Sequence, residues 1–275
     1  MMHRLLVLLL LFLPAFLHGQ KSDGVRTTLP VQLAHAVFTV HDLPPPGTTP
    51  APAVILLFTG KGDWTLWEDR VGGHLAKMGY YVLGIETVRY ASVKGGDYAP
   101  DDFAADLERI VEAAPPAFVA RNAPIFLLGR GLGAAAALGG AAVPPPPPRL
   151  AGLIVTDVPE RGRYGYHLRD RIPFLAPGGE GTFTIKEAAA KLGTGQSALA
   201  VAQLHPDDGY FDTTSWLSAV QGPKKTIAYA RGWKNFGVAT PAFIRALDEA
   251  VAWQLSVHTL RTELEQGAAP PPAGP

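Results

Sequence analysis

The chain has 275 residues, of which 47% are hydrophobic and 17% are charged, so a large core can form and a disordered chain is disfavoured. Lysine and arginine together number 24, as do aspartate and glutamate, and the formal net charge is zero. This balance argues against a nucleic-acid-binding protein, which normally carries a positive excess. Cysteine is absent, which excludes disulfides, zinc–thiolate sites, iron–sulfur clusters and a thiol nucleophile. We expect no cofactor.

Residues 1–20 have the segment order of a secretory signal peptide. Arg4 precedes an apolar run over residues 5–17, and polar residues follow from His18. The run is shorter than the roughly 20 residues of a membrane-spanning helix, although an uncleaved membrane anchor is the alternative. We therefore predict a secreted or periplasmic protein with no transmembrane segment after signal removal.

Apolar runs alternate with segments of helical periodicity along residues 25–265. Strands are predicted over residues 31–40, 53–58, 80–85, 125–128, 150–156, 198–204 and 226–230. Helices are predicted over residues 64–78, 101–113, 134–142, 213–220 and 241 to about 265.

This alternation predicts an α/β fold, with a mostly parallel sheet and helices on both faces. Residues 159–191 are long for a connection and are predicted to form a small cap, and residues 266–275 a disordered tail rich in proline and glycine. Right-handed crossovers place the loops that follow the strands at one edge of the sheet, where we expect the functional site.

A glycine-rich turn at residues 129–133 lies between a predicted strand and a predicted helix. Its sequence, G-R-G-L-G, matches the nucleophile elbow G-x-S-x-G except that Gly131 stands at the nucleophile position. Glycine has no hydroxyl, so no acyl-enzyme can form there. The alternatives are a turn needed only for close packing and a dinucleotide-binding loop. The latter is disfavoured because the motif comes late in the sheet and Arg149, not an acid, lies near the expected ribose-binding position.

Three further segments carry a resemblance to a known family. They are T-G-K-G-D-W at residues 59–64, G-I-E-T-V-R-Y at residues 84–90 and A-A-D-L-E-R-I at residues 104–110. With the elbow, they resemble the VirJ/AcvB family of bacterial virulence proteins, in which S-G-D-G-G-W, G-I-D-S-L-R-Y-F and A-A-D-L-x-R-I occur at similar spacing. The resemblance is good over residues 53–156 and thinner to about residue 260. It implies an exported protein with an α/β-hydrolase fold.

The departures from the family pattern bear on activity. The resemblance places the catalytic serine at Gly131, the acid at Asp207 or Asp208, and the histidine in the loop 231–236, where Lys234 stands and no histidine is present. A catalytic triad works as a unit, so these losses predict a non-catalytic protein. The alternative is an active hydrolase, either with a site rebuilt from Ser92, His205 or Lys234 or with a different alignment of the last loops. The resemblance then implies envelope ester substrates such as aminoacylated phosphatidylglycerol.

The residues left at the sheet edge predict binding. Lys61, Arg130 and Lys234 make the expected pocket basic, and the backbone amides at the start of the helix after Gly131 favour an anion. We predict binding of an anionic or acyl-bearing small molecule, or of an envelope protein. The predicted ligand-binding residues are Thr59, Lys61, Trp64, Arg130, Leu132, Trp233 and Lys234, with Tyr164 and Phe236 as further apolar walls.

No metal site is predicted. Asp97, Asp101 and Asp102 are close in sequence, but two adjacent acids after Pro100 are better explained as the start of a helix, where carboxylates complement the helix dipole.

Overall fold

The computed structural model describes residues 27–267, apart from 35, 48, 61, 97–99, 145, 168–177, 194–197, 208–213 and 231–237. The predicted signal peptide at residues 1–20 and most of the predicted tail lie outside the described residues. The main strands are β1 (Thr27–Gln32), β2 (Val37–Leu43), β3 (Val54–Phe58), β4 (Tyr81–Ile85), β5 (Ile125–Arg130), β6 (Leu150–Thr156), β9 (Ala200–Pro206) and β10 (Lys224–Tyr229). The helices are α2 (Leu66–Lys77), α3 (Thr87–Val93), α4 (Pro100–Glu112), α5 (Leu132–Ala141), α6 (Ile185–Ala190), the 3-10 helix η4 (Ser215–Ala219) and α7 (Pro241–Gly267).

The eight strands form one sheet in the order β1-β2-β4-β3-β5-β6-β9-β10. The pairs β1–β2 and β2–β4 are antiparallel, and all other neighbouring pairs are parallel. The predicted α/β class with a mostly parallel sheet is therefore confirmed. β1 is an edge strand, which suits Pro30 because proline cannot donate to a ladder of hydrogen bonds.

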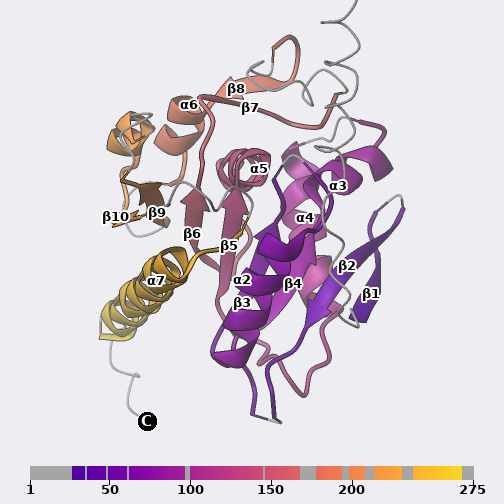
Figure 1. The fold of residues 1–275 in the computed structure, drawn as a ribbon, viewed down its shortest axis with the longest axis vertical. Helices are drawn as coiled ribbons and strands as arrows, with labels where there is room; N and C mark the ends of the chain where they lie inside the picture. The colour runs from indigo at the N-terminus through magenta and orange to yellow at the C-terminus, as the bar shows by residue number, and fades with distance from the viewer. Residues whose placement is uncertain are drawn as a thin grey trace, which may run out of the picture.

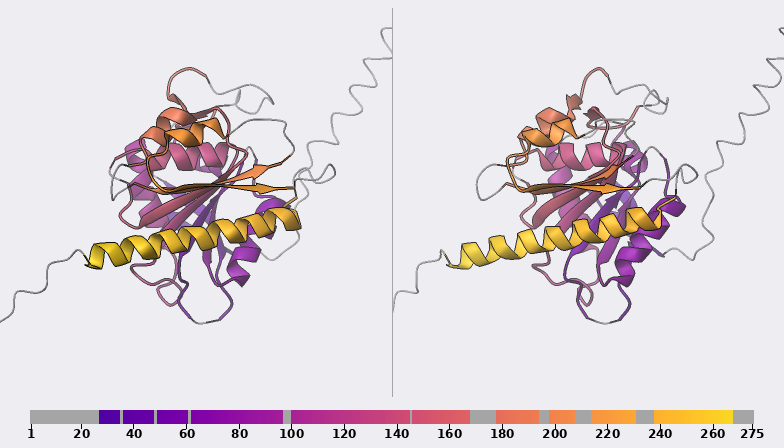
Figure 2. Two further views of the ribbon diagram at one scale, coloured as in Figure 1. Left: turned by 90° about the vertical axis from the view of Figure 1, so that its left-hand side faces the viewer. Right: turned by 60° about the vertical axis from the view of Figure 1, so that its left-hand side comes forward.

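Helices cover both faces of the sheet, which explains why the central strands are apolar throughout. Every residue of β3, β4 and β6 is buried. The side chains of α4, α5 and α6 pack with one face, and those of α2 and α7 with the other. Figures 1 and 2 show this layering, with α5 above the sheet and the long α7 below it in Figure 2.

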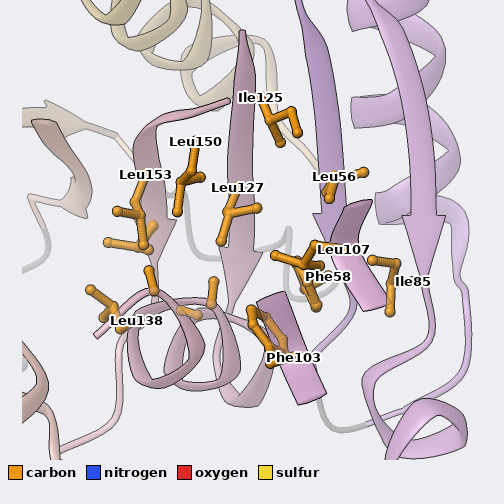
Figure 3. Packing of buried hydrophobic residues seen from close by; sticks show 14 of the residues in the cluster. Leu56, Phe58, Ile85, Phe103, Leu107, Ile125, Leu127, Leu138, Leu150 and Leu153 are labelled. Atoms are coloured by element: carbon orange, nitrogen blue, oxygen red, sulfur yellow. The ribbon is translucent and has the colours of Figure 1, made fainter. Parts of the chain in front are cut away.

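Close packing of α4 and α5 on the sheet forms the larger part of the core. Phe58 on β3 stacks on Phe103 of α4, with ring centroids 5.8 Å apart. Phe103 in turn occupies the space beside Gly140 of α5, where an added Cβ would lie 2.1 Å from its ring. Leu127 and Leu138 complete this layer (Figure 3). Glycine in α5 thus allows two helices to approach each other over the sheet.

The start of α2 is set by a capping box. The side chain of Thr65 accepts a hydrogen bond from the backbone N–H of Trp67, and the Glu68 carboxylate accepts one from the backbone N–H of Thr65 at 3.0 Å. The predicted helix over residues 64–78 therefore begins two residues later, and the loop after β3 ends at a defined point.

Three predicted elements differ from the structure. The single strand expected over residues 31–40 is the antiparallel pair β1 and β2, which turn where the N–H of Leu33 donates to the carbonyl of Ala36. The expected loop after β4 contains α3, and the helix expected over residues 213–220 is the short 3-10 helix η4. In addition, α7 continues through Gly267, so the first residues of the predicted tail are helical.

The described part of the predicted cap is a small hairpin followed by α6. The hairpin strands are β7 (Arg161–Arg163) and β8 (Thr182–Thr184). Phe183 packs against Gly139 of α5, where an added Cβ would lie 2.4 Å from its ring. The hydroxyl of Tyr164 donates to the carbonyl of Gly139 at 3.2 Å. Tyr164 therefore packs against α5 rather than forming a wall at the sheet edge.

Among the described residues, no helix combines the length and the apolar character that crossing a membrane requires.

Candidate functional site

The carboxyl ends of the parallel strands lie at one edge of the sheet, as expected. Thr59, Gly131, Asp157 and Asp207 follow directly after β3, β5, β6 and β9, which are neighbours in the sheet. In open α/β sheets, ligands bind at this edge. The candidate site is therefore built from these loops.

Gly131 forms a sharp turn between β5 and α5. Its backbone has φ +57° and ψ −120°, a conformation that residues with a side chain rarely adopt. A Cβ added at this position would meet only the Cα of Gly60, at 4.0 Å. The turn therefore has the strained backbone of a nucleophile elbow and the space for a side chain, but no side chain.

The two flanking glycines have a different physical role. A Cβ added at Gly129 would lie 2.6 Å from the backbone nitrogen of Ala134. A Cβ added at Gly133 would lie 2.4 Å from the carbonyl oxygen of Thr59. Neither distance is tolerable for a real side chain. Gly129 and Gly133 thus let α5 pack directly against β3 and β5, as the elbow motif requires.

Thr59 holds the loop after β3 in place. Its hydroxyl donates to the carbonyl of Gly62 at 3.1 Å and accepts from the backbone N–H of Thr87 at 3.1 Å. Its carbonyl accepts from the Thr87 hydroxyl at 2.8 Å. The residue is fully buried. Thr59 therefore ties the loop to the start of α3, and its predicted ligand contact stays a prediction.

Trp64 is also buried, and its predicted role as a pocket wall stays a prediction. Its side chain is 5% exposed, stacks on His41 at 4.2 Å between ring centroids, and fills the space above Gly84. Its indole N–H donates to the Asp69 carboxylate at 2.6 Å. His41 also bonds Glu86 at 2.8 Å, and this hydrogen bond holds the pKa of the Glu86 carboxyl below its usual value.

Arg130 lies beside the elbow, as predicted. Its guanidinium carbon is 4.5 Å from the ring centroid of Trp67, a cation–π contact that fixes the side chain. An added Cβ at Gly60 would lie 3.6 Å from its Nε, so the loop after β3 runs next to it. Arg130 and Leu132 are both partly exposed. Arg130 therefore places a cation beside Gly60, the residue nearest to the open position at Gly131.

Five predicted site residues lie outside the described residues. They are Lys61, Asp208, Trp233, Lys234 and Phe236. Their predicted roles remain predictions.

The described residues considered for a rebuilt catalytic site lie on β9, directly after β9 and on α3. Asp207 follows β9, its N–H donates to the carbonyl of Tyr229 at 3.0 Å, and its side chain is exposed. His205 lies within β9 rather than in the loop after it. The hydroxyl of Ser92 donates to the carbonyl of Val88 at 2.8 Å, four residues earlier in α3, so it bonds the backbone of its own helix.

Asp157 is a residue of this edge that the motif analysis did not single out. It follows β6 directly, is exposed, and has φ +50°, which makes it the one non-glycine residue with positive φ in the described part of the chain. The available signal was a polar residue immediately after a buried strand.

Asp101 and Asp102 lie in the first turn of α4, as predicted, and Asp102 pairs with Lys94 at 3.3 Å. Asp97 is outside the described residues. Across the part of the chain that the structure describes, no three histidine, aspartate or glutamate side chains gather in a way that could hold a metal ion.

The sheet order, the elbow and the flanking helices define an α/β-hydrolase fold. Solved structures with this fold superpose on most of the chain. Est1E from Butyrivibrio proteoclasticus gives a TM-score of 0.57 at 11% identity, covering 83% of this chain and 99% of its own. A dienelactone hydrolase from Anabaena variabilis gives 0.55 at 14% identity, covering 84% and 96%. DcsB, solved with a substrate analogue, gives 0.57 at 12% identity, covering 84% and 99%. At these identities the likeness concerns the fold.

The sequence comparison is narrower and more specific. Residues 52–139 match the model of the family described as the bacterial virulence protein VirJ. The matched segment runs from β3 through the elbow to α5. The predicted resemblance to VirJ is thus confirmed over these residues. No curated protein sequence matches the chain.

Proposed function

We propose that this chain is an exported α/β-hydrolase-fold protein of VirJ type that binds a ligand or partner at the elbow without serine-hydrolase catalysis. The observation that supports this most directly is Gly131. Its backbone has the geometry of the elbow and there is room for a side chain, yet the nucleophile is missing. The signal-peptide pattern of residues 1–20 supports export.

Binding can persist after such a loss because different groups carry it. A serine hydrolase stabilises a developing oxyanion with backbone N–H groups, and the covalent step needs the hydroxyl in addition. Here the first turn of α5 retains its N–H groups, and Arg130 adds a permanent positive charge beside Gly60, which borders the elbow. This combination favours a carboxylate or a polarised ester carbonyl, so an anionic or acyl-bearing ligand is the proposed class.

A fluorophosphonate probe followed by mass spectrometry of labelled peptides tests the absence of catalysis. We expect no labelled serine in the full chain, with a cooperative melt showing that the protein is folded. Labelling of one defined serine would overturn the proposal and favour the active hydrolase of envelope ester substrates.

A pair of variants tests whether the elbow is correctly placed. Gly131→Ser combined with Lys234→His restores the missing nucleophile and base, and we expect the probe to label residue 131. Gly131→Ala with Lys234→His is the matched control and is expected to stay unlabelled. If both double variants fold and neither is labelled, residue 131 is not at a usable nucleophile position.

Calorimetric titration with octanoate and octanol tests the ligand class, because the two probes differ mainly in charge. We expect octanoate to bind more tightly, and Arg130→Gln to remove this preference. Equal binding of both probes by the unmodified protein would refute an anion-selective site at the elbow.

A further inference from the structure

A hollow lies away from the elbow, between α2 and α7 on the opposite face of the sheet from α5. Its volume is about 500 Å³, which is within the usual range of small-molecule sites. It is lined by Arg70, Gly73 and Lys77 of α2 and by Ile244 and Arg245 of α7, among others, and by none of the elbow residues. We call it the α2–α7 groove. The two helices lie side by side below the sheet in Figure 2.

Two hydrogen bonds connect α2 to α7 and to the segment just before it. Nε2 of His74 bonds the carboxylate of Asp248 at 2.6 Å, which joins α2 to α7. Nη1 of Arg70 donates to the carbonyl of Ala239 at 3.1 Å, just before α7 begins. These bonds fix the two helices relative to each other, so a ligand would enter a preformed site.

The charge in the groove is unbalanced. Three permanent cations line it, Arg70, Lys77 and Arg245. Two carboxylates stand against them: Asp69 in the lining, which accepts the indole N–H of Trp64, and Asp248, which bonds the lining residue His74. Among the described residues, no carboxylate forms an ion pair with any of the three cations. Cations gathered in a concave site concentrate anions there.

Two further features indicate the kind of anion. Pro241 begins a helix of 27 residues at the groove, and the positive end of its dipole adds to the cationic side chains. Ile244 provides an apolar contact, and a Cβ added at Gly73 would meet nothing within 4 Å, so space remains for an organic group. The planar forks of two arginines suit the oxygens of a phosphate.

We propose that the α2–α7 groove binds a phosphorylated small molecule that carries at least two negative charges. The residues that line this groove are separate from those of the elbow.

The test is calorimetric titration of the full chain with pyrophosphate, alongside citrate and phosphatidylglycerol vesicles. We expect pyrophosphate to bind more tightly than citrate, with affinity that falls as salt is raised. Lys77→Gln with Arg245→Gln should weaken pyrophosphate binding on the order of tenfold or more, because it removes two charge-assisted contacts. Arg121→Gln with Lys186→Gln changes the net charge equally at exposed positions elsewhere and should leave binding unchanged.

A second variant tests the space rather than the charge. Gly73→Leu places a side chain in the open groove and replaces glycine inside a helix, so it should abolish pyrophosphate binding while the melting temperature stays the same or rises. Arg130→Gln should leave pyrophosphate binding intact, which separates this proposal from the elbow site.

Four results would overturn the proposal. They are no saturable binding of pyrophosphate, tighter binding of citrate, equal weakening by both charge-removing pairs, and recruitment to vesicles without binding of the soluble anion.

Discussion

The three glycines of the elbow are expected to respond very differently to alanine. At Gly131 the added methyl has room, since its nearest neighbour is the Cα of Gly60 at 4.0 Å, and the cost is that of the positive φ alone. A strained backbone of this kind costs about 1–3 kcal/mol. At Gly129 and Gly133 the methyl would lie 2.6 Å and 2.4 Å from backbone atoms, which cannot move without displacing α5 or β3. For Gly129→Ala and Gly133→Ala we expect the free energy of unfolding to fall by about 4 kcal/mol or more.

Urea denaturation followed by tryptophan fluorescence measures these losses, since the chain has 5 tryptophans. In a domain of this size, each kcal/mol corresponds to about 2–4 °C in melting temperature. Gly131→Ala should therefore melt about 4–8 °C below the unmodified protein for a typical cost of about 2 kcal/mol. Gly129→Ala and Gly133→Ala should lower the melting temperature at least twice as much, or fail to fold. The reasoning is refuted if Gly131→Ala is as destabilised as Gly133→Ala, or if Gly133→Ala is neutral.

Three other substitutions test the packing and the electrostatics. Asp106→Asn should lower the melting temperature by on the order of 10 °C, because the fully buried carboxylate 2.8 Å from Nζ of Lys94 is removed and the buried ammonium keeps only the more exposed Asp102, at 3.3 Å; a change within 2 °C or so would contradict this reading. Glu86→Gln should destabilise the protein at neutral pH, with the difference vanishing in acid. His41 holds the pKa of Glu86 below its ordinary value of 4.5, so the ionised carboxylate contributes stability that is full above that pH and lost as the pH falls further; melting curves at pH 7 and pH 3 check this, and a pH-independent difference would count against it. Phe183→Ala should cost about 2–3 kcal/mol in urea denaturation, since it vacates the contact with α5, and a loss below about 0.5 kcal/mol would show that the cap is only loosely attached.

Much of the fold follows from local sequence pattern. The strand over residues 150–156 has the predicted bounds, and most other central elements agree within two residues. These elements are predictable because a strand buried on both faces requires a continuous apolar run, and such runs are visible in the chain itself. α3 was missed because it has only 7 residues, too few to show a helical period, and begins without a side-chain cap at Glu86.

The candidate site is predictable only in part. The elbow was evident from the spacing of three glycines, and its strand–turn–helix context places it at the edge of the sheet. Thr59 and Trp64 lie in the same family-like segment, yet their side chains are buried. Sequence spacing assigns residues to a loop, but it does not say which of them point inward, because that depends on partners such as His41 and Thr87 that are distant in the chain.

By itself, the sequence determined the alternation of strands and helices, the identity of the elbow and the absence of a hydroxyl at Gly131. These properties depend on residue type and on neighbours within a few positions. Only the tertiary structure decided that Gly129 and Gly133 serve packing while Gly131 has free space, and that Arg130 lies against Trp67. It also decided that cations of α2 and α7, more than 160 residues apart, line one groove. The bond between Arg70 and Ala239, which are 169 positions apart, is likewise a result of the tertiary structure. Such contacts form because burial of apolar faces brings distant helices together, and no local pattern encodes which polar side chains then meet.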